Sequence, residues 1–163
     1  MISIIAAMDE KRGIGKNNRI PWHIKEDLVK LRNLTKDHLV ILGRKTYESM
    51  DGYYNNSGRP MPGELYIVIT RDKNYKPTRE NATTVNSLEE ALEKAKDEGE
   101  SFIIGGAQIF EQAMPFVDRL YLTIVEGNFD CDTFFPEYSK FKIISEEEGE
   151  PGEYRYKFVT LAR

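Results

Sequence analysis

Short apolar runs alternate with amphipathic segments along most of the chain. Runs rich in Ile, Val, Leu, Tyr and Phe, with the length of β-strands, predict an eight-stranded protein. They are Ile2–Ala7, Leu39–Leu42, Leu65–Ile69, Thr83–Val85, Phe102–Ile104, Leu120–Val125, Phe141–Ser145 and Tyr154–Leu161. Other segments place apolar residues at helical spacing and predict four helices. They are Lys25–Thr35, Lys45–Met50, Ser87–Glu98 and Gln108–Met114.

The order of these elements predicts an α/β fold. Strands that alternate with helices pair in parallel and carry helices on both faces of the sheet. The last two strands are joined by the acidic turn Glu146–Glu153, so we expect them to pair antiparallel. This gives a three-layer α/β/α domain with a mainly parallel central sheet of about eight strands and an antiparallel C-terminal edge. We expect one domain over residues 1–163, in which Asp51–Ser57 is a surface loop.

Composition narrows the classes of partner. The chain has 23 basic and 27 acidic residues, a net charge of -4, and no long run of either sign. This argues against nucleic acid or an anionic membrane as the main partner. The apolar run Met1–Met8 is short and has no basic leader, so we expect a strand rather than a signal peptide or a membrane span. The single cysteine, Cys131, fits a reducing compartment. We expect a cytoplasmic monomer that binds a small molecule.

Asp27 is an acid on the apolar face of the first predicted helix. Leu28, Leu31 and Leu34 recur at helical spacing, and Asp27 falls inside the same arc. A carboxylate that faces a core is costly unless a cation or strong donors meet it. Asp27 is therefore either a capping acid that bonds the first amides of its own helix, or a functional group that binds a ligand.

Three consecutive predicted strands end in residues suited to an anion. They are followed by Gly43-Arg44-Lys45-Thr46, by Thr70-Arg71, and by Gly105-Gly106-Ala107-Gln108. Ligands of open α/β sheets bind at the carboxyl ends of the parallel strands. Two cations at the start of a helix oppose the helix dipole unless an anion lies between them and the helix end. The pattern predicts a phosphorylated nucleotide, and an isolated 2′-phosphate explains Arg44 and Arg71 better than NAD does.

The chain resembles the dihydrofolate reductase family along nearly its whole length. The matching motifs, in order, are Ile5-Ala6-Ala7, Gly15, Ile20-Pro21-Trp22, Asp27, Gly43-Arg44-Lys45-Thr46, Gly58-Arg59-Pro60-Met61-Pro62-Gly63, Ile104-Gly105-Gly106-Ala107, Tyr121-Leu122-Thr123 and Asp132-Thr133-Phe134-Phe135-Pro136. The resemblance implies NADPH-dependent reduction of 7,8-dihydrofolate to tetrahydrofolate, in support of one-carbon metabolism. It implies no metal and no covalent intermediate.

The resemblance also implies roles for individual residues. Asp27, supported by Thr123, would hold the pterin, and Ile20 and Trp22 would belong to a mobile loop, Asp9 to about Trp22, that closes over the nicotinamide. The other implied substrate-binding residues are Ile5, Ala6, Leu28, Leu31, Arg32, Met50, Arg59 and Ile104. The implied NADPH-binding residues are Ala7, Ile14, Gly15, Asn18, Gly43, Arg44, Lys45, Thr46, Thr70, Arg71, Ile104, Gly105, Gly106, Ala107, Gln108, Ile109 and Phe110. The Gly105–Gly106 bond is typically cis in the family.

The chain departs from the family pattern where the substrate's tail should bind. Glu64 stands where the family usually has an arginine that grips the α-carboxylate of the folate glutamate. Arg32 and Arg59 are the two candidate replacements, and Asp51–Ser57 is an insertion in the same region. The departures keep open three alternatives: a pterin reductase for a methanopterin-type tail, the related reductase of riboflavin synthesis, and a non-catalytic nucleotide-binding module.

Overall fold

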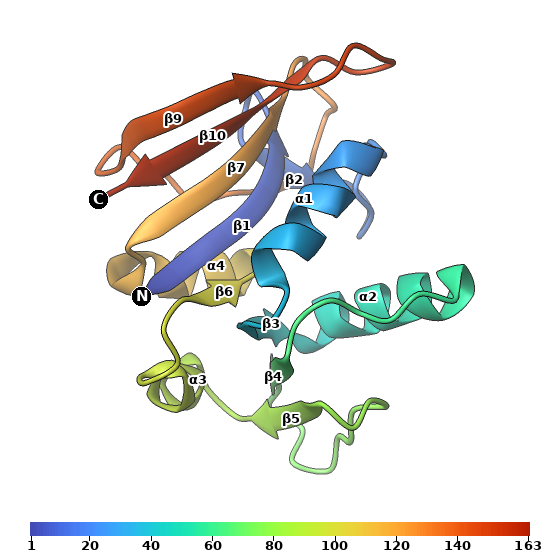
Figure 1. Ribbon diagram of the computed structural model, residues 1–163, viewed down its shortest axis with the longest axis vertical. Coiled ribbons are helices and arrows are strands. Elements are labelled where there is room, and N and C mark those ends of the chain that lie inside the picture. The colour runs from blue at the N-terminus through green and yellow to red at the C-terminus, as the bar shows by residue number, and fades with distance from the viewer.

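The computed structural model describes all residues 1–163 and is built around one eight-stranded sheet (Figure 1). The strand order across this sheet is β5-β4-β3-β6-β1-β7-β10-β9, and β2 and β8 form a separate two-stranded sheet. The strands are β1 (Ile2–Asp9), β2 (Gly13–Gly15), β3 (Leu39–Gly43), β4 (Leu65–Ile69), β5 (Ala82–Val85), β6 (Ser101–Ile103), β7 (Arg119–Val125), β8 (Thr133–Phe134), β9 (Lys142–Glu148) and β10 (Tyr156–Ala162). The helices are α1 (Lys25–Thr35), α2 (Arg44–Ser57), α3 (Leu88–Ala95), α4 (Ala107–Ala113) and the short 3-10 helix η1 (Met114–Phe116).

The predicted pairing of the strands is confirmed. From β5 to β7 all neighbours are parallel, and β10 pairs antiparallel with both β7 and β9. The parallel strands bring their carboxyl ends to one edge, so Gly43 at the end of β3, Thr70 after β4 and Ile104 after β6 lie at that edge. The sheet therefore gathers the residues that the sequence singled out for an anion.

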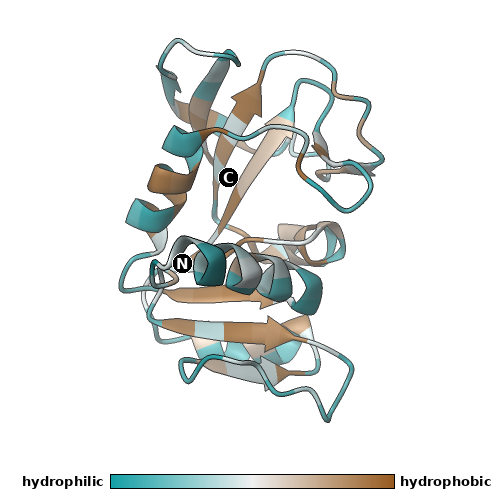
Figure 2. Cartoon of the chain, turned by 90° about the vertical axis from the view of Figure 1, so that its right-hand side faces the viewer, coloured by the Kyte–Doolittle hydropathy of each residue, from teal (hydrophilic) through white to brown (hydrophobic).

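The sheet separates two apolar layers. Ile41 of β3 packs in a core with Ala91 of α3 and Phe110 of α4. Its neighbours Val40 and Leu42 point to the other face and pack with residues of α2. This period-2 alternation explains how a strand with four buried residues in a row supports helices on both faces. Figure 2 shows the side of the molecule that carries α1 and α2. These helices contain both hydrophilic and hydrophobic residues, whereas the strands beside them are mainly hydrophobic.

The predicted loop Asp51–Ser57 is wrong, because α2 continues through it to Ser57. Tyr54 is 4 % exposed and packs with the core beneath α2, and Asp51 forms an ion pair with Arg79 at 2.7 Å. The helix then ends at Gly58, which has the left-handed conformation at φ 71°. Tertiary contacts thus override the weak helix propensity of Gly, Asn and Ser in this segment.

Other boundaries differ by a few residues. The helix predicted to reach Glu98 ends at Ala95. Strand β9 extends into the predicted turn Glu146–Glu153 as far as Glu148, whereas β10 begins only at Tyr156, after the predicted start at Tyr154. The sequence patterns did not indicate β2 and β8, which have only three and two residues. None of the helices combines the length and the apolar composition that crossing a membrane requires.

Candidate active site

Asp27 does not cap its helix. The N-cap of α1 is Ile24, which makes no side-chain capping bond, and the Asp27 amide itself donates to the Ile24 carbonyl at 3.1 Å. Asp27 lies within the first turn and its side chain turns toward the sheet. The structure therefore rejects the capping interpretation and keeps the functional one.

The partner of Asp27 is Thr123 on β7. The Thr123 hydroxyl, in a residue 4 % exposed, donates to Asp27 Oδ1 at 2.5 Å. Burial raises the pKa of Asp27 above its ordinary value, and the Thr123 bond and the Lys30 ammonium offset part of this rise. Because Thr123 donates to one oxygen, further acceptor positions of the carboxylate remain free for a ligand with two N–H groups.

The raised pKa makes a prediction about stability. When the pKa of an acid is higher in the folded state than in the unfolded state, its protonated form favours folding. This contribution to stability is complete below the unfolded pKa, about 3.9, and is lost as the pH rises through the folded pKa. Asp27→Asn removes the buried charge and keeps an oxygen for Thr123. We expect its melting temperature to exceed that of the wild type at pH 7 and to approach it near pH 3.5. A melting difference that does not depend on pH would contradict this assignment of the pKa.

The apolar residues around Asp27 are partly open. The apolar residues that the resemblance assigned to substrate binding are all half-buried: Ile5, Ala6, Leu28, Leu31, Met50 and Ile104. Met50 and Ile104 pack against the core beneath α2, while Ala6 packs against the core on the opposite face. Side chains that support the core on one side and stay accessible on the other are typical of ligand clefts.

The loop before α1 is fastened at two places. Trp22 is buried and its ring meets Phe129 edge-on at 5.1 Å, whereas Ile20 is 64 % exposed. Farther upstream, the Asn17 amide donates to Asp132 at 2.9 Å and the Asp132 amide donates to the Gly15 carbonyl at 2.9 Å. Ala7, Ile14 and Gly15 are half-buried and Asn18 is exposed.

Gly43, the last residue of β3, contacts the glycines that follow β6. The Gly43 amide donates to the Gly105 carbonyl at 2.8 Å, and the Gly105–Gly106 peptide bond is cis, as the resemblance implied. A Cβ atom added at Gly105 or Gly106 would lie 3.5 or 3.6 Å from Thr46 Oγ1. The two glycines therefore leave a space beside the Thr46 hydroxyl that any other residue would fill. Helix α2 starts here with no side-chain cap and no acid in its first turn.

Arg44 is held by three neighbours. Its guanidinium lies over the Tyr75 ring at 4.2 Å and pairs with Glu48 at 3.2 Å and with Asp72 at 3.4 Å. Asp72 belongs to the segment that follows β4, so the structure brings Arg44 next to the Thr70-Arg71 segment, as predicted. Of the remaining predicted residues, Thr70 and Phe110 are buried, Ala107 and Ile109 are half-buried, and Lys45, Arg71 and Gln108 are exposed.

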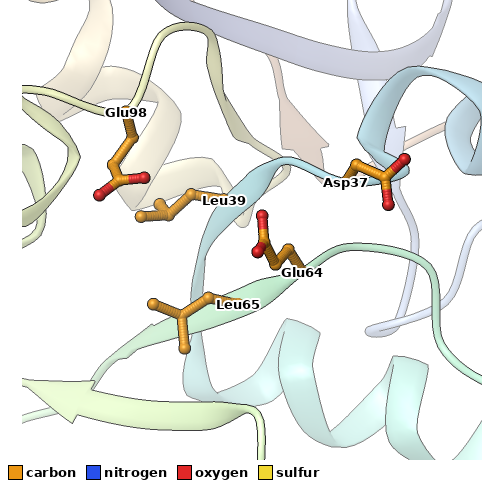
Figure 3. Close-up of a pocket in the computed structure, with 5 residues that line it drawn as sticks. All are labelled: Asp37, Leu39, Glu64, Leu65 and Glu98. Carbon is orange, nitrogen blue, oxygen red and sulfur yellow. The ribbon is translucent and has the colours of Figure 1, made fainter.

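Glu64 lies among other acids. It lines a hollow at the start of β3 and β4 together with Asp37 and Glu98, and the other lining residues are Leu39 and Leu65. Figure 3 shows these side chains around the start of β3, with the Glu64 carboxylate between Leu39 and Asp37. The lining contains no cation, so it would not stabilise the carboxylate of a substrate.

Arg32 faces α2. Its guanidinium lies 5.7 Å from the centre of the Tyr54 ring, and Tyr54 belongs to the part of α2 that continues beyond the predicted helix. Arg59 is exposed just after the helix. The extended helix thus supplies an aromatic face for Arg32, which the sequence patterns did not anticipate.

Asp9 is a functional candidate that sequence analysis missed. It is 1 % exposed, and its carboxylate accepts bonds from the amides of Lys11, Gly13 and Phe129 at 2.9, 2.8 and 3.1 Å. It ties the start of the loop before α1 to the segment around Phe129. An acid that ends an apolar strand was the available signal.

The whole chain matches the family model described as dihydrofolate reductase, over residues 1–163. A dihydrofolate reductase of Bacillus subtilis (strain 168) is 40% identical over 170 residues, covering 100% of this chain and 95% of that protein. A type 3 dihydrofolate reductase of Salmonella typhimurium is 36% identical over 168 residues, covering 100% of this chain and 98% of that protein.

A solved structure agrees with these relatives. The dihydrofolate reductase from Enterococcus faecalis, complexed with NADP(H) and RAB-propyl, superposes with a TM-score of 0.86 at 33% identity. The superposition covers 100% of this chain and 96% of that one. Matches of this extent favour the folate interpretation over the methanopterin-type reductase, the riboflavin-pathway reductase and the non-catalytic module.

Proposed function

This chain belongs to the dihydrofolate reductase family, and we propose how its own residues carry out the NADPH-dependent reduction of 7,8-dihydrofolate to tetrahydrofolate. The observation that carries the proposal is the half-buried Asp27 carboxylate, held by Thr123 beside apolar residues of α1, α2 and β1. A carboxylate offers a two-point acceptor for a ring N–H and the neighbouring amine of a pterin.

Asp27 and Thr123 orient the pterin and polarise it. Asp27 accepts the bonds from the pterin N3–H and the exocyclic amine, and Thr123 fixes the direction of the carboxylate. When bound, NADPH supplies the hydride, which adds to C6 of the pterin. A water molecule admitted beneath the loop 9–22 brings the proton to N5, so that the C6=N5 double bond is reduced. Asp27 raises the electron density of the ring and does not itself touch N5.

The residues at the strand ends fit a phosphorylated dinucleotide. The uncapped start of α2 and the space beside Thr46 suit the pyrophosphate, because backbone amides and the helix dipole favour an anion there. Arg44, Thr70 and Arg71 suit the 2′-phosphate of the adenosine, because a guanidinium binds phosphate through two parallel hydrogen bonds. Closure of the loop that carries Ile20 excludes bulk water from the nicotinamide.

We further infer that the protein is a cytoplasmic monomer that binds no nucleic acid. The net charge of -4 and the absence of a long basic run support this inference. Cys131, the one cysteine of the chain, is free and half-buried, which suits a reducing compartment.

In this proposal, Arg32 rather than residue 64 binds the carboxylate of the folate tail. Arg32 is half-buried and lies over Tyr54, whereas Glu64 lines a hollow with two other acids. We expect Arg32→Ala to weaken dihydrofolate binding by about 1–3 kcal/mol while leaving a dihydropterin without the glutamate tail almost unaffected. Equilibrium titration with both ligands measures the difference. Arg59→Ala tests the other candidate arginine, and this proposal predicts that it leaves both affinities almost unchanged, because Arg59 is exposed just after α2.

Glu64→Arg tests the same point from the other side. The substitution restores the cation that the family usually has and removes one of the acids of the hollow. We expect tighter dihydrofolate binding, with a gain that shrinks at high salt because Glu64 is exposed. If Glu64→Arg and Arg32→Ala both leave affinity unchanged, the tail is not bound at this place.

A further inference from the structure

The first turn of α1 is attached to the last strand of the chain. Glu26 Oε2 accepts a hydrogen bond of 2.7 Å from the Tyr156 hydroxyl, across 130 positions of sequence. The same oxygen accepts a second bond of 3.3 Å from the Glu150 amide, in the connection between β9 and β10. Glu26 is therefore held by two groups of the hairpin at the antiparallel edge.

The position of Tyr156 is itself fixed. Tyr156 is 9 % exposed and its ring packs edge-on against Phe158 at 5.6 Å. The ring also lies directly over Gly149, where an added Cβ atom would come within 2.1 Å of it. Only glycine at position 149 leaves room for the Tyr156 ring. The Tyr156 hydroxyl that bonds Glu26 is therefore held in a fixed position by the packing of its ring.

The same strands hold the partner of Asp27. In the register of β7 and β10, Phe158 lies opposite Thr123. Tyr156, two residues earlier in β10, lies opposite Val125. One turn beyond Glu26, the Lys30 ammonium sits 4.2 Å from the centre of the Phe158 ring. Helix α1 therefore contacts the β7–β10 pair through Glu26, Asp27 and Lys30 in succession.

We propose that Tyr156 is a positioning residue. Its hydrogen bond to Glu26 sets the distance between Asp27 and Thr123, and so fixes the direction in which the Asp27 carboxylate faces the pterin. The inference rests on the proposed role of Asp27. Neighbouring residues of a helix point about 100° apart, so Glu26 can reach the hairpin while Asp27 faces the cleft. Because the helix backbone joins them rigidly, a shift of the first turn at Glu26 moves Asp27 as well.

Tyr156→Phe tests this proposal, with Tyr154→Phe as its matched control. Both substitutions remove one hydroxyl from the same hairpin, but Tyr154 packs against the Phe129 ring and does not bond Glu26. Glu26→Ala removes the acceptor and Glu26→Gln keeps an acceptor oxygen. Glu26 is only half-buried, so its variants test the bond even if Tyr156→Phe fails to fold.

Two readouts separate positioning from a purely structural role. The first is the pKa of Asp27, followed by a 13C NMR titration of labelled aspartate carboxyls and assigned with Asp27→Asn. Lys30 and Thr123 are the groups that lower this pKa in the folded protein, and burial is what raises it. The second is steady-state kinetics, with kcat and KM determined separately for dihydrofolate and for NADPH.

We expect Tyr156→Phe and Glu26→Ala to lower kcat/KM for dihydrofolate by about 3- to 10-fold. This is less than the loss of a charge-assisted hydrogen bond to the substrate itself, because Tyr156 acts on Asp27 through Glu26. The pKa of Asp27 should fall in both variants, because a looser first turn admits water to the carboxylate. KM for NADPH should stay unchanged, and Glu26→Gln and Tyr154→Phe should resemble the wild type. The proposal is wrong if Tyr156→Phe and Tyr154→Phe behave alike, or if Tyr156→Phe lowers only the melting temperature. If Asp27→Asn itself keeps full activity, the proposed function fails instead.

Discussion

Asp27→Asn is expected to lose most dihydrofolate reduction at pH 7, by roughly 10²- to 10³-fold in kcat, while the fold and NADPH binding persist. The amide has nearly the shape of the carboxylate and can still accept from Thr123 through its oxygen. It presents an NH₂ group where the pterin needs an acceptor, and it removes the negative charge that polarises the ring. Two favourable contacts therefore become one contact and one clash between donors.

The loss should depend on pH. At low pH the substrate can be protonated in solution before it binds, so the variant should come closest to the wild type there. Asp37→Asn is a suitable control, because Asp37 is an exposed acid just beyond the other end of α1. Rates are measured by NADPH oxidation from about pH 5 to about pH 8. Activity like that of the wild type at pH 7 would remove Asp27 from the mechanism.

Arg44→Ala and Arg71→Ala are expected to raise KM for NADPH strongly and KM for NADH little. Only NADPH carries the 2′-phosphate, and each lost charge-assisted contact is worth about 1.5–3 kcal/mol, or roughly 10- to 150-fold. Arg44→Ala should have the larger effect. It leaves Glu48 and Asp72, both now without their guanidinium partner, to repel the phosphate.

The control for these variants is a cation far from the strand ends. Lys94→Ala changes the net charge equally, on an exposed face of α3. It should leave the ratio of the two KM values unchanged, which separates local phosphate binding from the long-range field of the protein. Equal losses with NADPH and NADH in both arginine variants would show that these side chains do not bind the 2′-phosphate.

Hydrophobic periodicity was sufficient to predict the architecture of the main sheet. The strand β3 and its neighbours consist of consecutive buried residues, and α1 has a clear apolar stripe, so both could be predicted from sequence. The segment Asp51–Ser57 could not, because its helix depends on the burial of Tyr54 and on the ion pair between Asp51 and Arg79, which is distant in sequence. Short strands such as β2 carry too few residues for any periodicity.

The candidate site was predictable where a residue type conflicts with its local surroundings. Asp27 on an apolar face and Arg44 at a helix start are such conflicts, and in the proposed function the pterin and the 2′-phosphate resolve them. Contacts that bring together residues with ordinary local surroundings could not be found this way. The bond from Tyr156 to Glu26 joins the last strand to the first helix, and the place of Arg32 over Tyr54 depends on the unpredicted turns of α2.

Reduction of dihydrofolate by this protein is tested by following the transferred hydride itself. The protein is mixed with dihydrofolate and with NADPH that carries deuterium at the transferable position of nicotinamide C4, and the tetrahydrofolate product is examined by mass spectrometry and NMR. The proposed function predicts one deuterium at C6 for each NADPH oxidised, and almost none with Asp27→Asn over the same time at pH 7. Binding of NADPH without transfer of deuterium to dihydrofolate would contradict it.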